Sequence, residues 1–181
     1  MKDMFWAVLL GALVLLGGVV WLMLPKPAAM PSTPISGTVT ENTDVTTMKI
    51  TLAEFSFTVD GQNPNDPINF VAGQTYSITF VNAGSIEHEV LAGNGDLLQR
   101  DDGTPDGYTN NFFENQEITV RFPSDETEKV INDLEEIGLE PGESATVTLT
   151  IPQSYAGQTF EIGCFVPGHY EAGMKAAIVI Q

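Results

Sequence analysis

Cysteine and histidine are both scarce in this sequence, which has one cysteine, Cys164, and two histidines, His88 and His169, among 181 residues. A single cysteine excludes an intramolecular disulfide framework, a four-thiolate zinc or iron–sulfur site, and a two-copper centre bridged by paired thiolates. Two histidines exclude every mechanism that needs three or more imidazoles. Thiolate and imidazole chemistry can therefore come only from these three side chains.

Basic residues are few as well. The chain carries 7 Lys+Arg against 24 Asp+Glu, a formal net charge of −17. This balance argues against a nucleic-acid partner, because such a protein needs a basic surface to displace counterions from phosphates. The hydrophobic content of 43% and the ten phenylalanines are too high for a disordered acidic chain. We therefore expect a folded domain with a hydrophobic core.

The amino-terminal segment is an apolar run without charges. Residues 5–24 read FWAVLLGALVLLGGVVWLML, and as a helix they would be about 30 Å long, the hydrocarbon thickness of a bilayer. Trp6 and Trp21 lie near the two ends, where aromatic rings favour the membrane interface. We predict that residues 1–24 form a transmembrane anchor. The alternative is a secretory signal that is cleaved off.

The next segment, residues 25–46, has the composition of a tether. Four prolines lie among serine, threonine, glycine and alanine: Pro25, Pro27, Pro31 and Pro34. Such a stretch has little to bury and is typical of an extended linker.

From residue 47 onward the dominant hydrophobic period is two, which indicates β-strands. Apolar and polar residues alternate over 48–52, 55–59, 76–80, 118–122, 145–151, 160–164 and the terminal AAIVI run. The pattern slips by one residue between Leu52 and Phe55, which predicts a bulge or a bend. Several half-buried strands without a long helix between them favour an antiparallel β-sandwich.

An acidic insertion, about residues 92–140, interrupts this pattern. Within it Val130, Leu134 and Ile137 follow one another at spacings of four and three, and Asp125 precedes them as an N-cap. We predict one short amphipathic helix here, packed on the sandwich.

The most informative segment is GCFVPGHYEAGM, in which four residues separate Cys164 from His169 and four more separate His169 from Met174. The other histidine, His88, lies upstream in SIEHEV. A thiolate, two imidazoles and a weak thioether are the ligand set of a blue-copper electron-transfer site. The alternative is ordinary packing, since a buried cysteine is usually inert and a methionine usually fills a core. By chance this spacing would follow a given cysteine only about four times in ten thousand.

The sequence resembles the cupredoxin family, the small type 1 (blue) copper proteins such as azurin, auracyanin and plastocyanin. The resemblance covers residues 47–181 and rests on MKITLAEFSFTV, VAGQTYSITFVNAGSIEHEV, PGESATVTLTIP and CFVPGHYEAGM. It implies an all-β fold, an eight-stranded Greek-key β-sandwich with one type 1 copper. The implied ligands are His88, Cys164 and His169 in the equatorial positions and Met174 in the weak axial position.

The resemblance also implies details around the site. Many members carry Asn or Ser directly after the first histidine ligand, where it ties the ligand loops together, whereas this chain has Glu89. The resemblance suggests that His169 reaches an exposed edge and passes the electron through an apolar patch; the alternative is plain loop packing. The candidate patch residues are Phe165, Val166, Pro167, Tyr170 and Ala172.

The expected function is one-electron transfer rather than catalysis. Four protein ligands leave no open position for a substrate, and both histidines are used, so no second, catalytic copper can be built. We expect a membrane-tethered carrier that is not an enzyme, with the copper domain on the extracytoplasmic side of the cell membrane. The alternatives are a copper delivery or storage module and an accessory domain of an oxidase.

The surplus of acid suggests how redox partners are chosen. Acidic residues far outnumber basic ones between Glu87 and Glu143. A basic docking patch on a cytochrome or on a membrane oxidase or reductase would be attracted to such a surface. The alternative is that these acids only keep the domain soluble.

Overall fold

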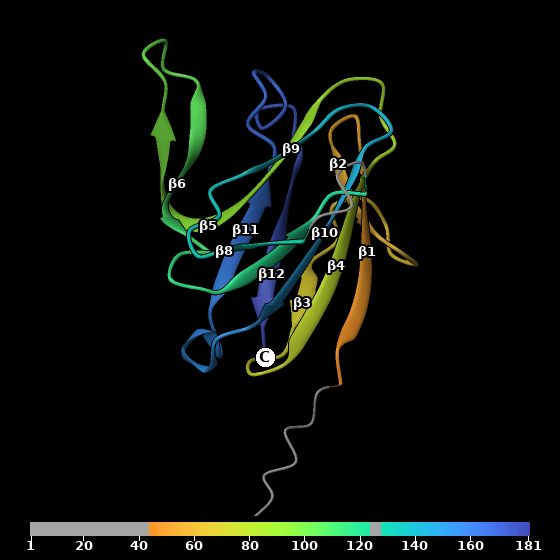
Figure 1. Ribbon diagram of the computed structural model, residues 1–181. Helices are drawn as coiled ribbons and strands as arrows, with labels where there is room; N and C mark the ends of the chain where they lie inside the picture. The colour runs from red at the N-terminus through yellow and green to blue at the C-terminus, as the bar shows by residue number, and fades with distance from the viewer. Residues whose placement is uncertain (1–43, 124–127) are drawn as a thin grey trace, which may run out of the picture. The chain divides into compact units, whose positions relative to one another are not determined.

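A computed structural model of the protein describes residues 44–123 and 128–181. Those residues form twelve strands and a single turn of 3₁₀ helix (Figure 1). The elements are β1 Thr46–Ala53, β2 Ser56–Val59, β3 Ile68–Phe70, β4 Thr75–Asn82, β5 His88–Gln99, β6 Pro105–Asn111, β7 Ile118–Arg121, β8 Glu128–Ile131, β9 Ile137–Leu139, β10 Ser144–Thr150, η1 Gln153–Tyr155, β11 Thr159–Gly163 and β12 Lys175–Ile180.

The strands form two sheets that face each other, which confirms the predicted all-β sandwich. One sheet has the order β2-β1-β4-β10-β7-β8, and the other has the order β3-β12-β11-β5-β6, with β9 paired to β5. The pairs are antiparallel, as expected, except for two that are parallel, β1 with β4 and β3 with β12. The described strands also exceed the eight that the resemblance implies, because the 92–140 insertion contributes strands of its own.

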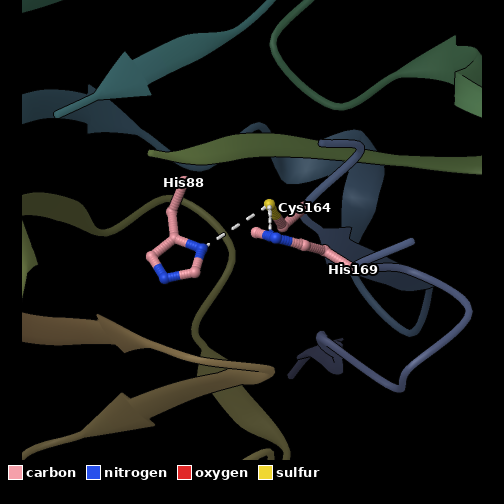
Figure 2. A group of neighbouring side chains, drawn as sticks. All are labelled: His88, Cys164 and His169. Carbon is pink, nitrogen blue, oxygen red and sulfur yellow. Dashed lines mark hydrogen bonds between the residues drawn. The ribbon is translucent and has the colours of Figure 1, made fainter. Parts of the chain in front are cut away.

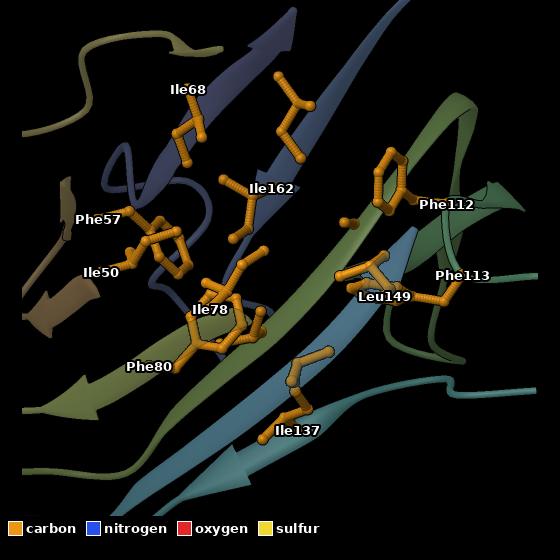
Figure 3. Close-up of a cluster of buried hydrophobic side chains, with 14 of the residues drawn as sticks. Ile50, Phe57, Ile68, Ile78, Phe80, Phe112, Phe113, Ile137, Leu149 and Ile162 are labelled. Atoms are coloured by element: carbon orange, nitrogen blue, oxygen red, sulfur yellow. The ribbon is translucent and has the colours of Figure 1, made fainter. Parts of the chain in front are cut away.

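The core lies between the two sheets and follows from the alternation in the sequence. Along β4 every second side chain is buried, and β10 repeats the pattern. Their buried residues, such as Ile78, Phe80 and Leu149, belong to one buried cluster with Ile162 of the opposite sheet (Figure 3). Each fully buried side chain of this size contributes about 1.5–3 kcal/mol to folding, so the sandwich is a rigid frame for the loops at its ends.

The slip in hydrophobic phase after Leu52, which predicted a bulge or a bend, is a two-residue hairpin turn. Leu52 pairs with Phe57 in an antiparallel hairpin of β1 and β2, and the two residues of the turn are Glu54 and Phe55. Phe55 has a φ of 62°, in the left-handed region that bulky residues rarely adopt. The hairpin therefore holds a strained, exposed phenylalanine at one end of the sandwich.

The predicted amphipathic helix is wrong. Residues 128–131 form strand β8 on the edge of the first sheet, and residues 137–139 form β9, which pairs with the start of β5. Val130 is 63% exposed, whereas Leu134 and Ile137 are buried, so the three residues do not share one face. Spacings of three and four over so few residues are also compatible with short strands, and pairing with β7 and β5 decided between them. Asp125, the predicted N-cap, lies outside the described residues.

The predicted membrane anchor, residues 1–24, lies outside the described residues, as does nearly all of the predicted linker, residues 25–46. Within the described ranges, no helix has the length and hydrophobicity needed to span a bilayer.

Candidate metal centre

Three of the four predicted donor residues come together at one end of the sandwich. His88 is the first residue of β5, Cys164 directly follows β11, and His169 lies in the turn between β11 and β12. Their side chains point toward one another (Figure 2). All three are buried, with exposed fractions of 0% for His88 and Cys164 and 6% for His169.

The distances between the donor atoms suit a single ion. Cys164 Sγ lies 3.9 Å from His88 Nδ1 and 3.3 Å from His169 Nδ1, and one ligand atom from each residue falls within 4.8 Å of the others. Nitrogen and sulfur donors at ordinary bond lengths around one ion in a trigonal arrangement are about 3.7 Å apart. The three donors could therefore bind one ion without rearrangement of the backbone.

Backbone hydrogen bonds close the turn that carries Cys164, His169 and Met174. The amide of Cys164 donates to the carbonyl of Met174 at 3.1 Å, and the amide of Met174 donates to the carbonyl of His169 at 3.0 Å. The amide of His169 in turn donates to the carbonyl of Val166 at 2.9 Å. Met174 is fully buried. The local sequence thus places all three side chains on one closed turn, which explains their regular spacing.

Burial keeps the donors neutral before a metal binds. It raises the pKa of the Cys164 thiol, although the backbone amide of Glu89 donates to Sγ at 3.3 Å and opposes this effect. Burial also lowers the pKa of both imidazoles, and for His88 the neighbouring His169 adds to the decrease. Neutral imidazoles have lone pairs available for a metal, and metal binding would release the thiol proton.

The chemistry of this donor set fits one type 1 copper. A thiolate and a thioether are soft ligands that suit Cu(I), and imidazoles suit both oxidation states. In the described part of the chain, this is the one group of histidine, cysteine and acidic side chains whose donor atoms converge in this way. A structural zinc site would instead have four cysteine or histidine ligands, which this chain does not offer here.

The predicted apolar patch is correct only in part. Pro167 and Ala172 are exposed and Val166 is half-buried, but Phe165 and Tyr170 are buried. The rings of Phe165 and Tyr170 stack on each other, with centroids 4.8 Å apart and an interplanar angle of 14°. Two large aromatic rings on a short turn bury more apolar surface by stacking under it than by facing water.

Sequence reasoning missed the contribution of Phe55 to this surface. Its ring meets His169 edge-on, with centroids 5.6 Å apart and an interplanar angle of 89°, and 44% of Phe55 is exposed. Asn65 connects the β1–β2 turn that carries Phe55 to the turn that carries His169. Its Nδ2 donates to the carbonyls of Phe55 and Gly173, both at 3.1 Å. The phase slip marked this turn, but nothing in the sequence indicated that it packs on His169.

Comparison with family models and with curated protein sequences finds no match. Solved structures do match. An auracyanin from Roseiflexus castenholzii is 23% identical over 75% of this chain and 97% of its own, with a TM-score of 0.45. A rusticyanin from Thiobacillus ferrooxidans is 18% identical over 75% and 77%, also with a TM-score of 0.45. The Cu-containing nitrite reductase of Thermus scotoductus is 13% identical over 75% of this chain and 31% of its own, with a TM-score of 0.50.

The likeness to the nitrite reductase, at a TM-score of 0.50, supports the cupredoxin-like sandwich that the sequence resemblance implied. That neighbour is an enzyme, of whose length this chain covers 31%. The fold alone therefore does not decide between a carrier and an enzyme, and the function has to be argued from the site.

Proposed function

We propose that this cupredoxin-like domain is a blue copper protein that carries single electrons between redox partners and is not itself an enzyme. The observation that carries the proposal is the convergence of one buried thiol and two buried imidazoles, with donor atoms within 4.8 Å of one another. His88, Cys164 and His169 would be the strong ligands, and Met174, buried on the same turn, would be the weak axial one. Copper held there supplies a one-electron Cu(I)/Cu(II) couple.

The protein's part in this function is to keep the donors in place and to exclude water. His88 is fixed by the pairing of β5 with β9, in which it lies opposite Leu139. Cys164 and His169 are fixed by the closed turn. A donor set that moves little between two oxidation states keeps the reorganisation on electron transfer small. With four protein ligands in use, no open position remains for a substrate, which supports a carrier rather than a catalyst.

The exit for the electron would be His169. It is nearly buried, with 6% exposed, but it lies on the same turn as the exposed Pro167 and Ala172 and packs against the exposed Phe55. Aromatic and small apolar residues around a redox centre suit brief, weak encounters with a partner protein.

The charges of Glu87 and Glu89 act on Cys164, and that of Glu54 acts on His169. Such acids near this end would attract a basic patch on a cytochrome or on a membrane oxidase or reductase.

We also propose that the amino-terminal segment attaches the copper domain to the membrane. An apolar run at residues 5–24 would anchor the chain in the cell membrane, and residues 25–46 would hold the copper domain away from it on the extracytoplasmic side. An anchored carrier would move in the plane of the membrane between its donor and its acceptor.

Copper titration of the purified chain tests the proposal. We expect one Cu(II) per chain and an intense visible band from thiolate-to-copper charge transfer, which Cys164→Ser abolishes. Met174→Gln should keep the colour and lower the reduction potential. The control is Met48→Gln, at a half-buried position of β1, which should change neither the colour nor the potential.

Two outcomes would contradict the copper assignment: a colourless copper complex, or colour that survives the loss of Cys164. Voltammetry separates a carrier from a copper delivery module. A carrier shows a fast, reversible couple and retains its metal against a chelator, whereas a delivery module releases the metal readily.

A further inference from the structure

The hairpin of β5 and β6 connects His88 with the turn that carries Cys164 and His169. β5 begins with His88, and the hairpin tip follows its far end at Arg100. The register between β5 and β6 shifts twice, between Asn94 and Leu97 and again after Leu98. The bent hairpin rises at the end of the sandwich where the turn after β11 also lies (Figure 1). One strand thus carries a predicted ligand at its start and a cation close to its end.

Arg100 joins this hairpin tip to the turn that carries Cys164. Its Nη1 donates to the carbonyl of Phe165 at 3.0 Å and to the carbonyl of Pro105 at 2.8 Å. Its Nη2 forms an ion pair with Asp106 at 2.6 Å. The side chain is only 30% exposed. A guanidinium satisfied on both arms in this way is a rigid link, since its planar fork fixes the direction of each hydrogen bond.

The residue that Arg100 contacts is the immediate neighbour of Cys164. Phe165 is 1% exposed, and its ring is packed edge-on by Tyr108 of β6, with centroids 5.1 Å apart. Tyr108 also donates to Glu161 Oε1 at 3.1 Å. The hairpin therefore contacts Phe165 twice, through Arg100 at its carbonyl and through Tyr108 at its ring. These contacts restrict the movement of the Cys164–Phe165 segment.

We infer that Arg100 is a positioning residue of the metal centre, which clamps the Cys164–Phe165 segment to the strand that carries His88. This inference rests on the proposed function for its redox consequence, but the clamp itself is a property of the chain without metal. The insertion then has a role beyond connecting two strands, because Arg100 adds a second tie to the one that the Glu89 amide makes with Cys164 Sγ.

The test compares Arg100→Gln and Arg100→Lys with a matched control, Arg121→Gln, which removes the same charge from the exposed end of β7 in the other sheet. The first readout is amide hydrogen exchange in the metal-free chain. Arg100→Gln removes the hydrogen bond from the guanidinium to the Phe165 carbonyl. Hydrogen exchange of the His169 amide should then be faster by at least about tenfold, relative to the amide of Ile78 in the core. Arg100→Lys keeps the charge without the fork and should give a smaller increase.

The second readout is the electron self-exchange rate of the copper-loaded chain, which should fall in Arg100→Gln while the colour persists, and stay unchanged in Arg121→Gln. The inference is overturned if amide hydrogen exchange at His169 in Arg100→Lys equals that of the parent chain. It is also overturned if both Arg100 variants match the Arg121 control in amide hydrogen exchange and in electron self-exchange. Should Arg100→Gln fail to fold, Arg100→Lys alone decides the question. A parent chain that binds no copper would refute the proposed function but leave the metal-free exchange result valid.

Discussion

Asn82 shows how much a single buried polar side chain does for this site. It is fully buried and donates from Nδ2 to the carbonyls of Ile86 and Leu139, both at 2.8 Å, while its Oδ1 accepts from the amide of Gly84 at 2.9 Å. One side chain therefore fixes the loop that leads to His88 and the strand that pairs with it. In a buried setting each of these bonds is costly to leave unmade.

Asn82→Ala should accordingly lower the free energy of unfolding by about 2–4 kcal/mol, because it leaves two carbonyls and one amide without their partner. Denaturant unfolding followed by fluorescence measures the loss. The control is Asn110→Ala, which removes an exposed amide bonded to Asn94 at 3.0 Å and should cost less than about 0.5 kcal/mol. Equal losses in the two variants would contradict the role given to Asn82.

At the scale of the elements, the region after β7 shows how tertiary pairing overrides a local pattern. Val130 and Ile137 suit one face of a short helix by spacing, but they lie in two different strands. β8 pairs with β7 and leaves Val130 exposed, whereas β9 lies against His88–Val90 and buries Ile137. Strand β9 thus covers the start of β5, next to the metal centre.

Alanine substitutions distinguish these two strands from a helix. Ile137→Ala should cost about 2–5 kcal/mol of unfolding free energy, because it leaves a cavity in the core. Val130→Ala should cost less than about 0.5 kcal/mol, since its side chain faces solvent. Thermal and denaturant unfolding of both variants provide the measurement. Similar costs at both positions are what an amphipathic helix would give, and would contradict the strands.

At the scale of the whole molecule, the net charge of −17 would favour the approach of a basic redox partner of the kind proposed above. Several acids act close to the metal centre. Burial, and then the charge of Glu136, raise the pKa of the Glu89 carboxyl beside His88. Glu114 acts instead near Tyr155, whose pKa burial raises first and the Glu114 charge raises further. Tyr155 lies before β11, whereas Cys164 follows β11 at the metal centre. Glu114, near Tyr155, and Glu136, near Glu89, therefore lie toward opposite ends of the sandwich.

Reversal of charge at these two positions tests electrostatic steering. With a small basic cytochrome as the partner, Glu136→Lys should slow association by about two- to tenfold at low ionic strength, whereas Glu114→Lys should slow it less. Stopped-flow electron transfer measures the rates. The difference should shrink above about 0.1 M salt, where the Debye length falls to about 10 Å. A difference that persists at high salt would point to a short-range contact instead.

The sequence by itself determined the sandwich class, most of the strands, and the gathering of three candidate ligands on one turn. This was possible because alternation along a strand and spacing within a turn are local properties of the chain. Cys164, His169 and Met174 belong to a single closed turn, so their spacing was a reliable signal.

Only the tertiary structure decided what distant segments bring to the site. It placed Phe55 against His169 and Arg100 on the carbonyl of Phe165, and it brought His88, which the family resemblance had assigned to the site, beside Cys164. It also turned the expected helix into two strands. Each of these contacts joins segments that are far apart in sequence, or depends on which edge was free for pairing. Local periodicity contains no information about either, because both follow from how the sheets pack.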